Sequence, residues 1–263
     1  ETGYRYGVLT IDENITASDP DFTTTTTQHS LLANNFIVPW RHHLRETLEP
    51  LTQAYNTGLQ QGDIEFAMFA AVTASTNAFL LGQELNSLDA NLRLYSEQAR
   101  QFNQTPVLGL ACIYRQAVSN LMKPGTTPWL LQGDIYYEQG TLNADVDNAQ
   151  RVEVATDTVH SKQPDNANIA NLFILKTYLA VLFQRPADAL VFATPARANL
   201  YAVASSPAIP FFVLYESLAC INVLNTVSAR QRLALRIRIR VNQRQLRKWS
   251  HHAPQNHLHG YHM

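Results

Sequence analysis

Leu59-Gln60-Gln61-Gly62-Asp63 lies between two stretches of the chain whose apolar residues recur with the spacing of an α-helix. Gly62 can adopt the left-handed conformation that commonly ends a helix, and Asp63 is a favourable N-cap for the next one. The segment therefore predicts two helices joined by a tight turn. The second helix, from Ile64 to Leu81, is rich in alanine, which favours close approach of neighbouring helices.

The same arrangement, in which one amphipathic stretch ends at a turn residue and another begins, recurs along the chain. A single helical hairpin cannot bury its apolar faces, whereas stacked hairpins bury them against one another. The pattern predicts an all-α fold built from helical hairpin repeats. Domains of this kind usually hold or sense other molecules and do not catalyse reactions.

The clearest helix is predicted after Gly82, because six residues spaced three and four apart fall on one helical face. They are Leu85, Leu88, Leu92, Tyr95, Ala99 and Phe102. We expect this face to be buried against the helix that contains Ala70, Ala74 and Ala78.

Upstream of the opening hairpin, five apolar residues spaced four apart predict one helix, which Pro50 then breaks or kinks. They are Leu32, Phe36, Trp40, Leu44 and Leu48. The threonine run at residues 23–27 follows Asp19-Pro20-Asp21, and this composition favours a linker.

Downstream, Thr105-Pro106 predicts the N-cap and first residue of a helix that ends near Met122, and Thr127-Pro128 predicts another helix start. Further helices are expected at about residues 165–184, 186–203, 210–224 and 228–249. Pro195 falls inside one of them and would destabilise that helix by about 3 kcal/mol if the helix is continuous. Residues 236–241 alternate between arginine and aliphatic residues, so a strand stays open there as the alternative to a helix.

The pattern divides the chain into two parts. Residues 1–30 are predicted to be a poorly ordered or degenerate N-terminal segment, and residues 31–263 a helical-repeat domain that is truncated at both ends. The chain begins at Glu1 and stops at Met263 inside a stretch typical of an opening helix. We therefore expect it to be a fragment of a larger protein.

The composition favours a folded domain in a reducing compartment. Hydrophobic residues make up 46% of the chain, which is ample for a buried core. Cys112 and Cys220 lie within apolar helical patterns, and no secretory segment or run of about 18 apolar residues is present. These features predict a cytoplasmic location and no membrane span.

The charges are distributed unevenly along the chain. From Ser217 onward there are eight Lys or Arg and no Asp or Glu, whereas the remaining residues carry twelve Lys or Arg against 21 Asp or Glu. An overall charge of −1 thus hides a basic C-terminal part and an acidic remainder.

Several phrases of the chain resemble the tetratricopeptide-like helical region of large prokaryotic hybrid signalling kinases. The matching phrases occur in the expected order over roughly residues 35–259. They include Phe36-Ile37 with Trp40, Leu44-Arg45-Glu46-Thr47-Leu48-Glu49-Pro50-Leu51, Gly82-Gln83-Glu84-Leu85, Tyr114-Arg115-Gln116-Ala117-Val118-Ser119-Asn120-Leu121, Tyr215-Glu216-Ser217-Leu218-Ala219, and Lys248-Trp249-Ser250-His251-His252-Ala253-Pro254.

The resemblance implies an α-solenoid of tetratricopeptide-like hairpins inside a larger signalling protein. In that family, a serine/threonine kinase domain and an AAA-type ATPase domain precede the region, and a GAF domain and a sensor histidine kinase follow it. The resemblance therefore implies a non-catalytic scaffold or signal-relay segment of an ATP-binding parent kinase. The implied partners are neighbouring domains or other proteins that bind along a concave face.

The segment itself contains no nucleotide-binding signature, neither G-x-x-x-x-G-K-[ST] nor a glycine-rich loop followed by a strand lysine. We predict no catalytic site and no cofactor within it. His251, His252 and His259 form a weak alternative as metal ligands, because imidazoles on adjoining turns can bind zinc or nickel. The tail from Ser250 has no cysteine or carboxylate to complete such a site.

Arg232, Arg236, Arg240 and Arg244 are spaced four apart and form one row on the predicted basic helix from Arg230 to Arg247. We predict that this row docks against a partner or against the acidic remainder of the chain. The alternative is a free-standing helical module that binds nucleic acid or another anionic partner through this helix. The three tryptophans, Trp40, Trp129 and Trp249, are expected to serve packing.

Overall fold

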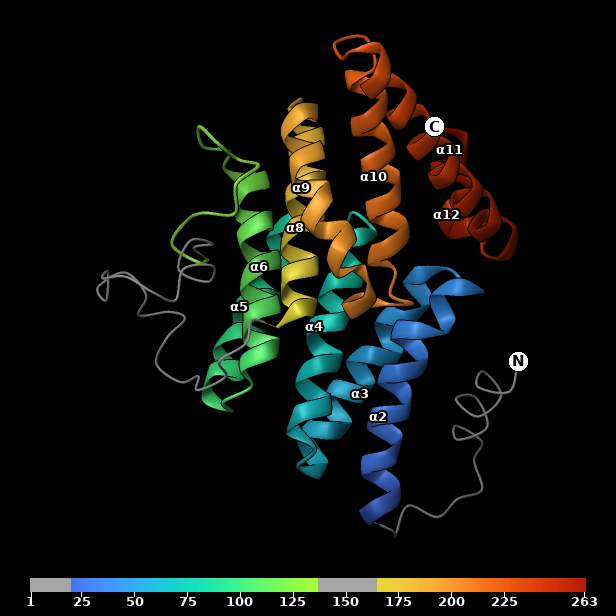
Figure 1. Cartoon of the computed structure of the whole chain (residues 1–263). Coiled ribbons are helices and arrows are strands. Elements are labelled where there is room, and N and C mark those ends of the chain that lie inside the picture. Colours follow the sequence, from blue (N-terminus) through green and yellow to red (C-terminus); the bar gives the residue numbers. More distant parts are fainter. Residues whose placement is uncertain (1–19, 137–164) are drawn as a thin grey trace.

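The computed structural model describes residues 20–136 and 165–263, which form ten α-helices and three 3-10 helices (Figure 1). The predicted all-α class is confirmed for these residues. The elements of the first part are α2 (Pro20–Phe36), η1 (Val38–Trp40), η2 (Leu44–Thr47), α3 (Leu48–Gln61), α4 (Ile64–Leu80), α5 (Leu85–Gln101) and α6 (Thr105–Met122). Those of the second are α8 (Asn166–Leu182), α9 (Pro186–Asn199), η3 (Leu200–Val203), α10 (Ala208–Val223), α11 (Ala229–His252) and α12 (Pro254–His262).

Helices that follow one another in the chain pack as pairs, and the pairs contact one another in a repeat-like series. The pairs are α3 with α4, α5 with α6, α8 with α9, and α10 with α11. Contacts between α4 and α5, between α6 and α8, and between α8 and α10 join them into one body. The long basic helix α11 and the short α12 lie at one end of this series (Figure 1).

The opening turn forms as its sequence predicts. Gly62 ends α3 with a left-handed φ of +81°, and Asp63 occupies the N-cap position of α4. The Asp63 side chain makes no capping hydrogen bond, and its burial raises the pKa of the carboxyl group. Because glycine adopts a left-handed φ without steric strain, Gly62 is the residue that makes this hairpin possible.

The helix predicted from the apolar stripe upstream is wrong as a single element. The stripe is divided among the end of α2, the two 3-10 helices and the start of α3. Pro39 lies in η1, and the chain changes direction there. Pro50 lies in the first turn of α3, where a missing backbone N–H interrupts no helical hydrogen bond, so it does not break the helix.

The threonine run at residues 23–27 is helical within α2, so the predicted linker is wrong, and the expected domain boundary near residue 30 falls inside this helix. Packing accounts for the difference. Thr27 is buried and lies so close to Gly58 of α3 that a Cβ at Gly58 would be 3.0 Å from Thr27 Cγ2. Tertiary contact thus overrides the poor helix propensity of threonine. Residues 1–19 lie outside the described part of the chain.

Of two expectations that involve proline, the structure contradicts the one at Thr127-Pro128. Residues after α6 form turns, so Thr127-Pro128 does not start a helix. Asn120 of α6 holds this segment, because its Nδ2 donates to the carbonyl oxygens of Pro128 and Leu130 at 3.0 and 2.8 Å. Pro195 lies inside α9, which nevertheless remains one continuous helix with Ala193 and Ala196 buried on either side of it.

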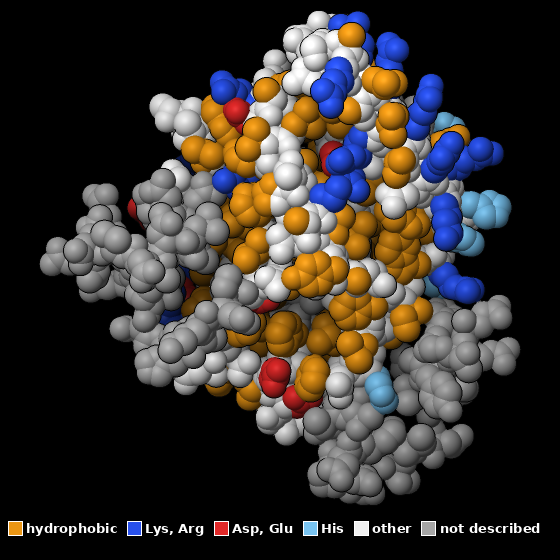
Figure 2. All heavy atoms as spheres, in the orientation of Figure 1, with side chains coloured by type: hydrophobic (Ala, Val, Ile, Leu, Met, Phe, Trp, Pro, Cys, Tyr) orange, Lys and Arg blue, Asp and Glu red, His pale blue; other side chains and the backbone are white. Residues whose placement is uncertain are grey.

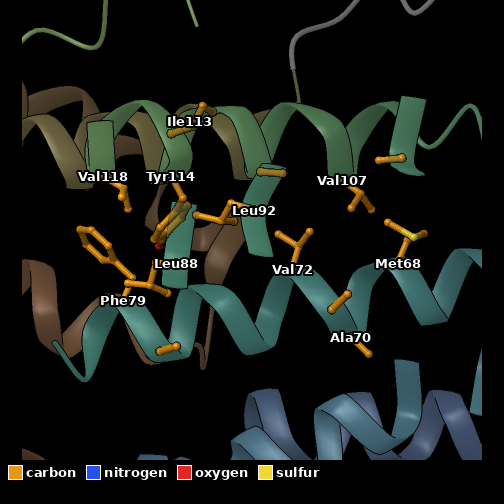
Figure 3. Close-up of a cluster of buried hydrophobic side chains, with 14 of the residues drawn as sticks. Met68, Ala70, Val72, Phe79, Leu88, Leu92, Val107, Ile113, Tyr114 and Val118 are labelled. Atoms are coloured by element: carbon orange, nitrogen blue, oxygen red, sulfur yellow. The ribbon is translucent and has the colours of Figure 1, made fainter. Parts of the chain in front are cut away.

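The predicted face of α5 is confirmed as part of the core. Leu88, Leu92 and Ala99 are buried, and the other three residues of the face pack partly buried against the same cluster. Figure 3 shows Leu88 and Leu92 among side chains of α4 and α6, including Phe79 and Tyr114. Helix α5 packs against α6 even more extensively than against the predicted alanine-rich α4.

Residues 236–241 belong to α11, so the strand alternative is wrong. No helix in the described ranges is long and apolar enough to cross a membrane.

Candidate interaction surface on α11

Helix α11 begins at a complete capping box. The Ser228 side chain accepts from the backbone N–H of Gln231, and the Gln231 side chain accepts from the backbone N–H of Ser228 at 3.1 Å. These two bonds satisfy N–H groups that a helix start leaves without partners. The local sequence therefore fixes where this basic helix begins.

The inner face of α11 packs against α10 and α12. Asn242, Leu246 and Ser250 are spaced four apart and are the buried residues of the helix. Leu246 joins the same apolar cluster as Phe212 and Val213 of α10. One face of α11 thus belongs to the core, and this leaves the opposite face to solvent.

A buried carboxylate joins three helices at this interface. The Glu216 side chain in α10 is only 2% exposed, and it accepts hydrogen bonds from Arg197 of α9 and from Arg238 and Asn242 of α11. The distances are 3.0 Å from Arg197 Nε, 2.8 Å from Arg238 Nη1 and 2.7 Å from Asn242 Nδ2. A buried charge is tolerated because these donors neutralise and hydrogen-bond it. The network holds α11 in a fixed orientation on α9 and α10.

Sequence analysis missed this network. Glu216 is the only acidic residue of an otherwise apolar helix, and that isolation was the signal available. Its partners Arg197 and Arg238 lie far away in sequence, so the pairing became visible only once the three helices were packed.

The four members of the predicted arginine row have different surroundings in the structure. Arg232 turns back toward α10, where Nε donates to the Leu224 carbonyl at 2.9 Å and Nη2 to the Val227 carbonyl at 3.4 Å. Arg236, Arg240 and Arg244 are exposed and make no hydrogen bond or ion pair with any described residue. The polar contacts of α11 with α10 are therefore made by Arg232, Arg238 and Asn242. The other three members of the row take no part in them.

The outer face of α11 carries an exposed aliphatic stripe beside these three arginines. Leu233, Ile237 and Val241 are spaced four apart and are 62%, 53% and 42% exposed. Figure 2 shows Lys and Arg side chains gathered along the upper right of the molecule, where Figure 1 places α11, with hydrophobic atoms among them. We call this surface, formed by Leu233, Arg236, Ile237, Arg240, Val241 and Arg244, the outer face.

The histidines of the C-terminal region do not converge. His251, His252 and His259 are all exposed, and only the first two are neighbours, with ring centroids 5.6 Å apart. In the described ranges, 20–136 and 165–263, no group of three or more His, Cys, Asp or Glu side chains could hold a metal ion.

His257 was not singled out as a separate site in the sequence, yet it is the histidine with the most unusual surroundings. Its ring centroid lies 5.7 Å from that of Trp40 and 6.3 Å from that of Trp249. Burial, with the nearby His259 as a second cause, lowers the pKa of His257 to about 4. The imidazole is thus neutral at pH 7.

The two tryptophans serve packing between η1 and α11, as predicted, with their own ring centroids 5.7 Å apart.

Both cysteines are buried thiols. Burial raises the pKa of Cys112 and raises that of Cys220 to about 11, with the Glu216 carboxylate as a further cause for the second. A thiol is a good nucleophile only as the thiolate, so neither group is activated at neutral pH.

Comparison of the chain with protein families, with curated proteins and with solved structures finds no match.

Proposed function

We propose that this chain is a non-catalytic helical-repeat scaffold that relays signals within a multidomain ATP-binding protein kinase carrying serine/threonine and histidine kinase domains. The phrases that resemble the helical region of hybrid signalling kinases support this proposal. The observation that carries the scaffold part is the outer face of α11, which combines exposed aliphatic side chains with arginines that pair with no described residue, on a helix whose inner face is anchored.

The anchoring matters because it makes the outer face a rigid platform. Glu216 ties α11 to α9 and α10, so a partner that binds the outer face pays little entropy for ordering the helix. A displacement of α11 on binding a partner would also move α9 and α10, because Glu216 links the three helices. These are the properties that a relay segment between catalytic domains requires.

The aliphatic stripe favours a protein partner over nucleic acid. Leu233, Ile237 and Val241 would gain little against phosphates, whereas an amphipathic protein surface would remove them from water. The flanking arginines then select a partner whose apolar centre is bordered by Asp or Glu. We therefore assign the outer face to an acidic, amphipathic surface on a neighbouring domain of the parent protein.

The second candidate, binding of nucleic acid or another anionic partner, rests on charge alone. Besides the three arginines of the outer face, Arg230, Arg247 and Lys248 are exposed, and α11 contains no acidic residue. This density of cations would release counterions on binding DNA, so the affinity would fall steeply with salt. Retention on DNA that depends on salt and survives loss of the aliphatic stripe would favour this candidate.

Direct titration against the flanking domains of the parent protein tests the proposal. The triple substitution of Leu233, Ile237 and Val241 to Ser is expected to weaken binding by about a hundredfold, since each lost aliphatic contact is worth roughly 1 kcal/mol. Substitution of Val191, an exposed aliphatic residue of α9, to Ser is the matched control and is expected to change nothing. Equal binding by the triple variant and the natural chain would contradict the proposal. The chain alone is expected neither to bind ATP nor to incorporate labelled phosphate.

A further inference from the structure

A second feature, separate from the outer face, is a pocket between the 3-10 helices η1 and η2, the end of α4, the start of α10, and α12. Its volume is about 330 Å³. Most of its lining is apolar and includes Leu44, Leu81, Pro210, Phe211, Leu214 and Leu246. Small-molecule sites typically have volumes of about 300 to 1,000 Å³ and combine an apolar lining with a few polar groups.

The walls of this pocket are fixed by hydrogen bonds between distant parts of the chain. The Asn256 side chain of α12 accepts from Leu44 N at 2.9 Å and donates to the carbonyls of Pro39 at 2.8 Å and His42 at 2.7 Å. Gln255 adds a bond from its Nε2 to the Arg41 carbonyl at 2.9 Å. The cavity is therefore a built feature of the fold, since α12 is held across η1 and η2 by side chains that satisfy their backbone groups.

The polar part of the lining consists of Arg45, the imidazoles of His43, His257 and His259, and the amides of Gln255 and Asn256. Arg45 lines the pocket, is exposed, and its side chain makes no hydrogen bond or ion pair with any described residue. His43 accepts from Arg45 N through Nδ1 at 3.1 Å, so the neutral ring carries its proton on Nε2 and is a donor. Among the described residues that line the pocket there is no Asp or Glu.

His257 adds an unsatisfied polar atom to the same lining. Its Nε2 is buried and has no hydrogen-bond partner among the described residues. Because the ring is neutral at pH 7, His257 adds no charge to this wall of the pocket. Among the described residues that line the pocket, Arg45 is the only Lys or Arg.

We infer that this pocket binds a small amphipathic anion, namely a medium-chain or aromatic carboxylate. The apolar body lies against Phe211, Leu214 and Leu246, and the carboxylate receives hydrogen bonds from the Arg45 guanidinium and His43 Nε2. Arginine suits a carboxylate because its fork of N–H groups can make two parallel bonds to the two oxygens. This inference stands independently of the proposed docking of α11.

Titration calorimetry of the whole chain with octanoate tests the inference, with octanol and octylammonium as probes of the same length and different charge. Octanoate is expected to bind at one saturable site and about tenfold or more tightly than either other probe. Equal binding of all three would overturn the anion assignment. Absence of saturable octanoate binding would overturn the site altogether.

Two variants locate the binding. Arg45→Gln changes an exposed side chain and is expected to weaken octanoate about tenfold while leaving octanol unchanged. Gly260→Leu is expected to fill the cavity, whereas Gly260→Ala is the matched control, because a Cβ there would make only ordinary contact with Leu214 at 3.5 Å. Octanoate binding that survives both Arg45→Gln and Gly260→Leu unchanged would place the ligand elsewhere and contradict the inference.

Discussion

Asn242 of α11 donates a hydrogen bond from Nδ2 to the Glu216 carboxylate of α10 at 2.7 Å, and both side chains are buried. This contact, together with those of Arg197 and Arg238, fixes the basic helix on the rest of the chain. The exposed charges of α11 are therefore presented on a rigid support.

Substitution of Glu216 by Ala should destabilise the chain by about 3 kcal/mol, because it removes the buried carboxylate that neutralises Arg197 and Arg238 and accepts from Asn242. The free energy of unfolding in urea measures the effect. Arg236→Ala on the exposed face is the control and should change the free energy of unfolding by less than about 0.5 kcal/mol. A loss below about 1 kcal/mol for Glu216→Ala would show that the network does not anchor α11.

The same reasoning predicts which substitutions loosen the C-terminal helices. Reversal of Arg236 and Arg240 to Glu should leave hydrogen exchange after Ser228 unchanged, since neither guanidinium makes a hydrogen bond or ion pair with a described residue. Asn242→Ala should accelerate exchange there while leaving α5 protected. Faster exchange in the double arginine variant would mean that the row itself docks against the acidic part of the chain.

Leu92→Ala should lower the free energy of unfolding by about 2–5 kcal/mol, because Leu92 of α5 is fully buried among side chains of α4 and α6 (Figure 3). Leu94 lies two residues away on the same helix and is 46% exposed, which makes Leu94→Ala a matched control. The free energy of unfolding of the control should stay within about 0.5 kcal/mol of that of the natural chain. Similar losses for both variants, measured by urea unfolding, would contradict the assigned face of α5.

Stability should depend on pH through His257. Its pKa is about 4 in the folded chain and about 6.5 when unfolded, so the unfolded chain binds more protons between these values. The free energy of unfolding should therefore fall by about 2 kcal/mol from this group as the pH is lowered from 7 to 5. His257→Phe keeps an aromatic ring beside Trp40 and Trp249 and should remove this part of the dependence. The same pH dependence in both proteins, followed by urea unfolding, would contradict the assignment.

The helices that could be predicted from sequence are those whose signal is local. The face of α5 and the turn at Gly62 depend on residues close together in the chain, and both are present in the structure. The division of the stripe around Pro39, and the helical state of the threonine run, depend on packing between α2 and α3. A one-dimensional pattern does not contain such contacts.

The same distinction applies to the candidate sites. The arginine row was visible from its spacing, but which arginines of α11 turn inward depends on where the Leu224 carbonyl and the Glu216 carboxylate lie in the packed structure. The pocket beside Asn256 was invisible, because its walls come from residues more than 200 positions apart. Spacing along one helix therefore identified a surface, while tertiary packing determined which of its side chains stay exposed.

The central claim is that the outer face of α11 docks on a protein surface. A photo-crosslinking amino acid placed at Ile237 of the complete parent polypeptide tests it most directly, with the same amino acid at Leu94 as control. The account predicts that position 237 becomes linked to one peptide of a neighbouring domain in which acidic residues border apolar ones, and that position 94 does not. Linkage of position 237 to added DNA alone, or to no protein segment at all, would contradict it.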